Sequence, residues 1–341
     1  MEKVKIKEKE LVELEEYSPS EPSDHEVRLK VAYCGICGSD VHAYFNEHPF
    51  ISLPIVPGHE CSATVEKLGG KVSGLKVGQK VTFIPQLTCG KCYNCRNGRY
   101  NICENLKVIG AQVDGAMTEL FNVDSKLVVP LPDDFDLMDA ALIEPLAVAI
   151  HAVKVTGSLF GENVLILGAG TIGLLLAQVS KFVGASSVMI TDVFNSRLKL
   201  AKQLGADFAI NSREFNLTKN YLRETFGERE AGVIFEAVGI EATIKQAVEL
   251  VRKGGRITVV GVFGKETKVN AGLIQDREIN IRGSLMYLKE DFEDAVELIR
   301  KGKVHVKPFI THIFELKDAS KAFETAAKEK EKALKVLIKI S

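Results

Sequence analysis

The sequence predicts an α/β fold in which a doubly wound parallel sheet is accompanied by a second, β-rich domain. Two observations lead to this class. From Gly161 onward, strand-like apolar segments alternate with helical patterns, and a parallel sheet needs such helical crossovers between its strands. The first 130 or so residues instead consist of short apolar segments broken by glycine and proline, which is typical of β-strands joined by loops.

The elements of the β-rich segment follow in chain order. Its strand candidates are EVRLKVAYCG, CSATVEKLGG, KVTFIPQ and KLVVPLP. A helix is predicted over residues 139–157, where an apolar pattern ends at a glycine. After about residue 284 come two helical patterns and the strand-like ALKVLIKI, and we expect this tail to fold back onto the first domain.

Six strand candidates make up the predicted parallel sheet. They are NVLILG, SVMITD, DFAIN, GVIFEAV, RITVVGV and EINIRGSL, with a helical pattern between most neighbours. A length of 341 residues accommodates two domains. We expect a discontinuous β-rich domain of residues 1–150 and 285–341, and a doubly wound domain of residues 151–284.

Composition excludes several classes of protein. Hydrophobic residues make up 46% of the chain, too many for a mostly disordered protein. The net charge of −1 argues against bulk binding to nucleic acid or to an anionic membrane. The charged start MEKVKIKEKE is unlike a secretory signal, so the seven cysteines indicate free or metal-bound thiols in a cytoplasmic protein rather than disulfides.

One uncharged run, residues 163–180, approaches the length of a membrane span. Three glycines interrupt it, at positions 168, 170 and 173. A buried strand, a turn and a buried helix explain this pattern better, and we expect no membrane segment.

The same run contains a glycine-rich turn, Gly168-Ala169-Gly170-Thr171-Ile172-Gly173, directly after a strand candidate and at the start of a helix. In a G-x-G-x-x-G turn the first glycine permits the tight turn, the second lets a pyrophosphate approach, and the third allows close helix–strand packing. The N-terminus of the helix offers free N–H groups to phosphate. This context predicts a dinucleotide site.

Asp192, at the end of the next strand candidate, bears on the choice of dinucleotide. A carboxylate there can accept hydrogen bonds from ribose hydroxyls and would repel a 2′-phosphate, which favours NAD over NADP. Arg197 is the counter-argument, because a nearby arginine can accommodate that phosphate. Asp192 as a helix cap or turn residue is the simpler alternative.

Four thiols lie close together in the segment TCGKCYNCRNGRYNIC. They are Cys89, Cys92, Cys95 and Cys103. Four thiolates can complete a tetrahedral zinc shell, which marks a structural zinc site. An iron–sulfur cluster and a CxxC redox pair are the alternatives.

A second, weaker constellation is formed by Cys37 with the pair His59-Glu60. These residues supply an incomplete shell that water or substrate would have to finish, as in a catalytic zinc site. A buried cysteine and a loop His–Glu pair are the plainer interpretation. Cys34 and Cys61 have no evident co-ligands and are expected in the core.

The order of the motifs GICGSDVH, PGHE, the four-cysteine segment, IEPLAVAIHA and GAGTIG resembles medium-chain zinc-dependent dehydrogenases over essentially the whole chain, most of all the polyol (sorbitol-type) branch. The resemblance implies a Rossmann domain, a GroES-like catalytic domain, one catalytic and one structural Zn²⁺, and NAD. It also implies hydride transfer from a small secondary alcohol to NAD, giving a ketone.

The resemblance also assigns the metal-site residues. Cys37, His59 and Glu60 map to the catalytic zinc site. Glu144, in the IEP motif, maps to a further ligand or to a residue bonded to the zinc water. Asp40 maps to the carboxylate that holds the ligand histidine.

Further roles follow from the same resemblance. Ser39 maps to the hydroxyl that touches the zinc-bound oxygen, and His42 to the outer member of a proton relay. The alternatives are that Ser39 caps a helix starting at Asp40 and that His42 is a surface residue. Asp192 and Arg197 map to the residues that hold the adenosine ribose.

One departure from the polyol branch affects the substrate. Met286 stands before Tyr287 where that branch often carries an arginine for substrate hydroxyls. Sorbitol is therefore uncertain, and vicinal diols (butanediol-type), other polyols, sugar acids and L-threonine stay open. The other classes considered are a non-enzymatic zinc protein and a zinc-independent reductase. We expect a homo-oligomer, a dimer or tetramer, without nucleic-acid partners.

Overall fold

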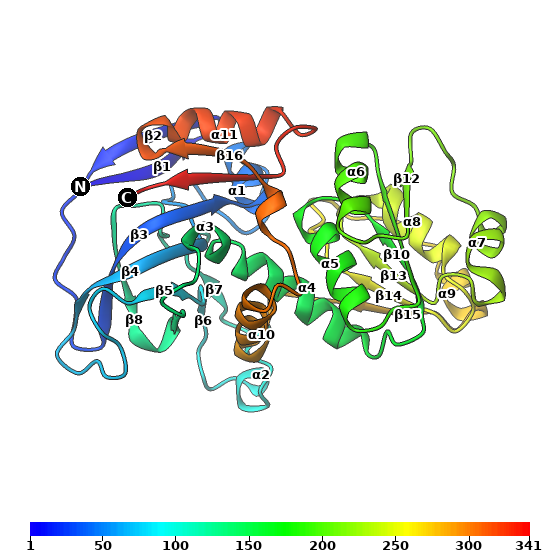
Figure 1. The fold of residues 1–341 in the computed structure, drawn as a ribbon, viewed down its shortest axis with the longest axis horizontal. Coiled ribbons are helices and arrows are strands. Elements are labelled where there is room, and N and C mark those ends of the chain that lie inside the picture. Colours follow the sequence, from blue (N-terminus) through cyan, green and yellow to red (C-terminus); the bar gives the residue numbers. More distant parts are fainter. The chain divides into compact units, whose positions relative to one another are not determined.

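The computed structural model describes residues 1–341 and divides into two compact units (Figure 1). The N-terminal unit comprises Met1–Glu144, Leu288–Arg300 and Val306–Ser341. The central unit comprises Pro145–Tyr287 and Lys301–His305. These limits differ by a few residues from the predicted domain limits, and the central unit gains the short return segment. That each unit is an independently folding domain stays a prediction.

The N-terminal unit is built on a sheet in the order β16-β17-β3-β4-β5-β9, with β8 paired to β3. Its strands are β3 (Glu26–Ile36), β4 (Glu60–Leu68), β5 (Lys80–Phe83), β8 (Leu120–Asp124), β9 (Val128–Pro130), β16 (Ile310–Glu315) and β17 (Lys335–Lys339). Two small sheets pair β1 (Glu2–Glu8) with β2 (Leu11–Glu16) and β6 (Gln86–Leu87) with β7 (Lys107–Val108). The helices are α1 (Gly38–Tyr44), α2 (Tyr93–Arg96), α3 (Leu137–Ala140), α10 (Lys289–Arg300) and α11 (Ala319–Lys328).

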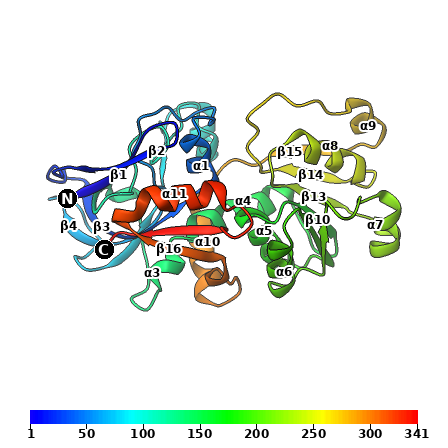
Figure 2. The same ribbon diagram turned by 90° about the horizontal axis from the view of Figure 1, so that it is seen from above.

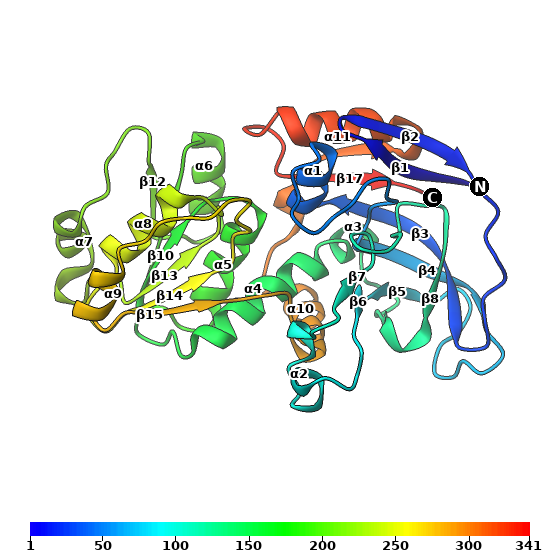
Figure 3. The same cartoon turned by 180° about the vertical axis from the view of Figure 1, so that it is seen from behind.

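The C-terminal tail folds back onto this sheet, as predicted. Strand β17 lies beside β3 and runs antiparallel to it (Figure 3). It also pairs with β16, in the parallel direction. It pairs Ile338 with Cys34, residues from opposite ends of the chain. Cys34 in turn pairs with Cys61 on β4, and both thiols are buried, as expected for core residues. The C-terminus therefore completes the layer that carries the N-terminal motifs.

The central unit holds a parallel sheet in the order β12-β11-β10-β13-β14-β15. Its strands are β10 (Asn163–Leu167), β11 (Ser187–Asp192), β12 (Phe208–Asn211), β13 (Val233–Glu236), β14 (Arg256–Val259) and β15 (Asn280–Gly283). The helices are α4 (Ile143–Thr156, which begins in the N-terminal unit), α5 (Thr171–Phe182), α6 (Asn195–Gln203), α7 (Lys219–Phe226), α8 (Glu241–Leu250) and α9 (Ala271–Asp276). All six predicted strands are present, so the predicted doubly wound fold is confirmed.

The strand order changes direction between β10 and β13, where the first strand lies beside the fourth. Helices α5 and α6 cover one face of the sheet, and α8 and α9 lie over the other (Figure 2). In such a sheet ligands bind beyond the carboxyl ends of the strands at the point of reversal. The glycine-rich turn leaves β10 at that point.

The helix predicted over residues 139–157 is interrupted: α3 ends at Ala140 and α4 starts at Ile143. Pro145 explains the break, because it has no N–H to bond the carbonyl of Ala141 and fits only the first turn of a helix. The uncharged run of residues 163–180 forms β10, the turn and most of α5, and no helix in the structure is long and apolar enough to cross a membrane.

Candidate functional site

The glycine turn in the central unit has the shape that the sequence predicts. Gly168 has φ +102°, and a Cβ there would lie 2.6 Å from Val238 Cγ2. A Cβ on Gly173 would lie 1.8 Å from the carbonyl oxygen of Gly168. A Cβ on Gly170 would meet no atom within 4 Å. Two of the glycines are therefore required by packing, whereas Gly170 borders open space that a ligand could enter.

Thr171 and Ile172 are the first residues of α5, so their backbone N–H groups lie at the N-terminus of this helix. The dipole of this twelve-residue helix also places a partial positive charge at its N-terminus. The turn and the helix start thus offer a cradle of donors beside the open space at Gly170, which suits a pyrophosphate.

Asp192 ends β11 and ties the glycine turn to the next strand. Its Oδ2 accepts a hydrogen bond from the Ala169 N–H at 2.7 Å, and its Oδ1 accepts from Val193 and Phe194 at 2.7 and 3.0 Å. These bonds support the interpretation of Asp192 as a turn residue. The two carboxylate oxygens together offer about four acceptor sites, and these three bonds leave one of them, on Oδ2, for a ribose hydroxyl.

Arg197 lies close to this carboxylate. One guanidinium nitrogen is 3.9 Å from Asp192 Oδ2, and the guanidinium stacks over the ring of Phe194 at 5.0 Å. Burial lowers the pKa of Arg197, while the charge of Asp192 opposes this shift. The structure thus brings together Asp192 and Arg197, the two residues predicted to hold the ribose.

In the N-terminal unit the structure gathers Cys37, His59 and Glu60, with one ligand atom of each within 4.8 Å of the others. Cys37 follows β3 at the N-terminus of α1, and His59 and Glu60 stand where β4 begins. His59 and Glu60 are buried. Cys37 is partly exposed, and a thiol, an imidazole and a carboxylate in one cluster are the donors of a zinc site with an open position.

Asp40 supports this cluster from the first turn of α1. Its Oδ2 accepts a hydrogen bond from the Cys37 N–H at 2.8 Å, and its Oδ1 lies 3.9 Å from His59 Nδ1. Neither Asp40 Oδ1 nor His59 Nδ1 has a hydrogen-bond partner in the structure, although both are buried. This arrangement fits a metal-binding histidine, because such a histidine usually donates the N–H of its second ring nitrogen to a carboxylate.

The electrostatics of the cluster favour a bound cation. Burial disfavours a charged imidazole, but Asp40, Cys37 and Glu144 together outweigh this effect and raise the pKa of His59 well above its usual range. Burial also raises the pKa of Asp40.

Glu144 is buried in the first turn of α4 but does not belong to the group of three ligand atoms. Its charge does act on His59, which places it in the same neighbourhood. A role for Glu144 as ligand or as partner of the zinc water stays a prediction.

Ser39 and His42 both lie in α1, three positions apart and hence on one side of the helix. Cys37 precedes the helix as its N-cap residue. The interpretation of Ser39 as the helix cap is therefore wrong, because the helix starts one residue before it. Ser39 is partly exposed and His42 is exposed in the last turn.

Lys335 is a residue of this neighbourhood that the sequence analysis missed. It is 2% exposed, and its Nζ donates to Glu60 Oε2 at 2.5 Å and to the carbonyl oxygen of Ile36 at 3.2 Å. Burial disfavours its charge, but Glu60 and Cys37 outweigh that effect and raise the pKa of Lys335. The only sequence signal is a lysine inside the apolar segment ALKVLIKI, which an outward-facing strand position explains equally well.

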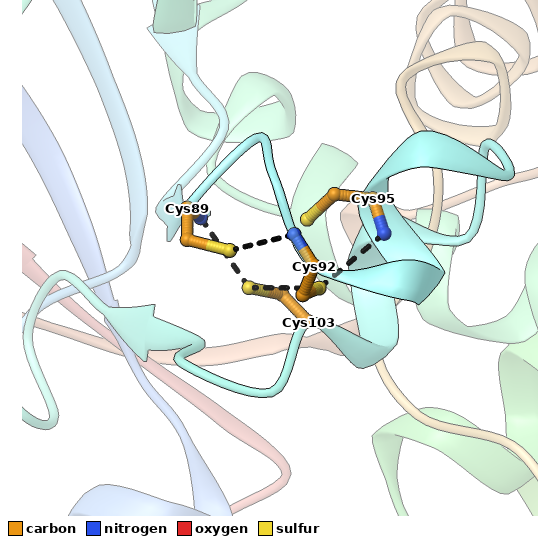
Figure 4. A group of neighbouring side chains, drawn as sticks. All are labelled: Cys89, Cys92, Cys95 and Cys103. Atoms are coloured by element: carbon orange, nitrogen blue, oxygen red, sulfur yellow. Dashed lines mark hydrogen bonds between the residues drawn. The ribbon is translucent and has the colours of Figure 1, made fainter.

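The second metal candidate lies in the four-cysteine segment (Figure 4). Its four sulfurs lie within 4.8 Å of one another, and Cys92 Sγ is 4.0 Å from Cys103 Sγ. Tetrahedral zinc with bonds of about 2.3 Å needs sulfurs about 3.8 Å apart. The residues of this cluster are Cys89, Cys92, Cys95 and Cys103, all of them free thiols in the structure.

Backbone N–H groups favour the thiolate form of Cys89 and Cys92, whereas burial and the neighbouring thiols raise the pKa of Cys95 to about 12. The N–H of Cys92 donates to Cys89 Sγ at 3.4 Å, and that of Cys95 donates to Cys92 Sγ at 3.5 Å. Hydrogen bonds from Lys91 and Cys92 lower the pKa of Cys89 to about 6. Metal ligands must be deprotonated, so this arrangement fits a bound cation.

Comparison with known proteins agrees with both units. The family described as zinc-binding dehydrogenase matches residues 171–301, and the alcohol dehydrogenase GroES-like domain matches residues 23–133. The chain is 37% identical to sorbitol dehydrogenase of Halalkalibacterium halodurans, over 93% of this chain and 92% of that protein.

Two solved structures extend the comparison. An alcohol dehydrogenase of Escherichia coli CFT073 complexed with NADH has a TM-score of 0.91 and 30% identity, covering 100% of this chain and 99% of that one. A zinc-binding dehydrogenase of Sinorhizobium meliloti 1021 bound to NADP also has a TM-score of 0.91, with 28% identity and 99% of each chain covered.

Proposed function

Because the chain belongs to the zinc-binding alcohol dehydrogenase family, we propose that it oxidises a polyol or another sugar-derived secondary alcohol to a ketone with NAD as the hydride acceptor. The observation that carries this proposal is the cluster of Cys37, His59 and Glu60, since these donors suit a zinc ion that keeps a position open for substrate. The glycine turn with Asp192 supplies the matching cofactor site.

Cys37, His59 and Glu60 would hold the catalytic zinc, with Glu144 as a fourth group beside it. When bound there, zinc would act as a Lewis acid that lowers the pKa of the substrate hydroxyl, and NAD would take up the hydride. The four-cysteine cluster would hold a second, structural zinc, because it provides four thiolates and no open position.

The residues around the cluster hold the ligands and move the proton. Asp40 orients Cys37 through its backbone N–H and faces the imidazole of His59. Ser39 can accept the proton of the substrate hydroxyl, because a serine hydroxyl both donates and accepts. His42, exposed on the same side of α1, can pass that proton to solvent, since an imidazole both accepts and releases a proton.

Asp192 supports NAD as the cofactor, since its carboxylate at the end of β11 would repel a 2′-phosphate. Arg197 beside it supports NADP as the second candidate. Steady-state kinetics with the two cofactors decide between them: the proposal expects a higher kcat/KM with NAD, and a preference for NADP would contradict it.

The substrate class rests on the motif resemblance and on the sorbitol dehydrogenase relative. Met286, at φ +50°, occupies the place of the arginine expected for the polyol branch. Vicinal diols, sugar acids and L-threonine are therefore the alternatives. We further propose a cytoplasmic homo-oligomer, a dimer or tetramer, which sedimentation analysis would test.

The decisive experiment is a screen of NAD reduction over polyols, diols, sugar acids and L-threonine, combined with metal analysis. We expect NADH formation with at least one secondary alcohol and about two zinc ions per chain. One zinc ion per chain and no alcohol-dependent NADH would favour a non-enzymatic zinc protein instead.

A further inference from the structure

Lys335 is a buried lysine that has no role in the proposed zinc and cofactor sites. It lies at the start of β17, which pairs with β3, while Glu60 starts β4 on the other side of β3. Its Nζ donates hydrogen bonds to the Glu60 carboxylate and to the backbone carbonyl of Ile36. A buried ammonium is costly unless it is paired, so its place beside the metal cluster calls for an explanation.

The packing around Glu60 determines which of its oxygens is accessible. Oε2 is 2.5 Å from Lys335 Nζ, and a Cβ on Gly35 would lie 2.3 Å from the same oxygen. Gly35 is the register partner of Glu60 across β3 and β4. With Oε2 enclosed by Lys335 and Gly35, Oε1 is the oxygen left for a metal ion.

The titratable groups near Lys335 are acidic, and their ionised forms carry negative charge. Cys37, Glu60 and Glu144 all act on its charge, and Asp40 lies within the reach of the same field. A divalent metal ion neutralises two of these negative charges once it binds. Lys335 therefore competes with the metal for one carboxylate, because both are cations that approach Glu60.

We propose that Lys335 is a positioning residue that holds Glu60 as a one-oxygen ligand and weakens zinc binding by competing for its carboxylate. The inference rests on the proposed zinc site at Cys37, His59 and Glu60. Without zinc, Lys335 pairs with Glu60 and holds its carboxylate in place. In the loaded protein its charge draws electron density from Glu60, so the carboxylate reduces the Lewis acidity of the metal less than a free one would.

The test is the zinc affinity of Lys335→Met, measured by competition with a chelator of known affinity. We expect it to bind zinc at the catalytic site at least about tenfold more tightly than the natural protein, because a like charge beside the metal is removed. The rise in Tm when zinc is added to metal-depleted protein should also be larger. Lys335→Gln, which keeps an N–H donor without the charge, should behave in the same way if Lys335→Met does not fold.

Two control variants isolate the effect. Lys339→Met removes a lysine from the same strand, where Lys339 forms an exposed ion pair with Glu315 at 3.3 Å, and it should leave zinc affinity unchanged. On a His59→Ala background, which removes one catalytic ligand, Lys335→Met should leave the remaining zinc binding by the four cysteines unchanged. Lys335→Arg should retain the affinity of the natural protein.

The outcomes separate this inference from the function it rests on. A zinc affinity for Lys335→Met that is equal to or weaker than that of the natural protein overturns the inference, because a residue that only supports the fold would weaken binding. An equal gain in Lys339→Met overturns it as well. A natural protein that holds zinc only at the four cysteines refutes the proposed catalytic site and this inference with it.

Discussion

The two variants Gly170→Ala and Gly173→Ala should separate cofactor binding from fold stability in the glycine turn. A Cβ at position 173 would lie 1.8 Å from the Gly168 carbonyl oxygen, about 1.2 Å short of the 3.0 Å that real Cβ atoms keep. Helix α5 must therefore shift away from β10. Forced overpacking of this kind costs about 1–3 kcal/mol of unfolding free energy.

At position 170 the same methyl group meets no protein atom within 4 Å, and the backbone there, with φ −73°, suits alanine. The free energy of unfolding should stay within about 0.5 kcal/mol of the natural value. A bound pyrophosphate, however, would be pushed away from the N–H groups of α5. Losing one hydrogen bond to a charged group costs about 1.5–3 kcal/mol, or roughly a 10- to 150-fold increase in Kd.

The assay pairs denaturant unfolding with a fluorescence titration of NADH on the same preparations. We expect weaker NADH binding with normal stability for Gly170→Ala, and reduced stability for Gly173→Ala. A natural NADH affinity in Gly170→Ala would refute the assignment of the open space beside Gly170 to the pyrophosphate. Unchanged stability of Gly173→Ala would refute the packing argument.

Three further predictions concern the metal cluster and its relay. Ser39→Ala should lower the hydride-transfer rate about 10²- to 10⁴-fold in stopped-flow single turnovers while the zinc content stays the same; an unchanged rate would exclude the relay role. Asp40→Asn should weaken zinc binding about 10- to 100-fold in chelator competition, because the group facing His59 loses its charge, and an unchanged affinity would show that His59 needs no such partner. Zinc affinity should fall as the pH decreases, since His59 must lose a proton to bind zinc and its pKa in the metal-free protein lies well above 6.5. The fall should already be evident near neutral pH, and an affinity that is flat from pH 8 to pH 6 would contradict the assignment of His59 as a ligand.

Local patterns were sufficient for part of the fold and part of the site. The six parallel strands of the central unit follow from the alternation of short apolar runs and helical patterns. Strands of a parallel sheet are covered by helices on both faces, so they are almost continuously apolar. The glycine turn and the four-cysteine cluster also follow from spacing alone. Their functional atoms lie within a few residues of each other, so local geometry brings them together.

The sequence could not show where partners from distant segments meet. It left open whether Ser39 caps a helix, and the structure places Cys37 in that position instead. The helix predicted from residue 139 is broken before Pro145. Proline lacks a backbone N–H and is tolerated in the first turn of a helix but not in its interior, so a new helix starts shortly before it. Asp192 was expected to face a ribose, yet it also bonds the backbone of the glycine turn.

The sequence by itself therefore determined the two kinds of unit, the dinucleotide turn and the four-cysteine cluster, since each depends on residue type and short spacing. The residues of the other candidate metal site were assigned through the resemblance of the motifs to a known family. Only the tertiary structure decided which groups surround those ligands. Lys335 reaches Glu60 across 275 positions of chain because β17 and β4 both pair with β3. Such a contact arises because strands from distant parts of the sequence pair with each other, and the local sequence pattern around either residue does not predict it.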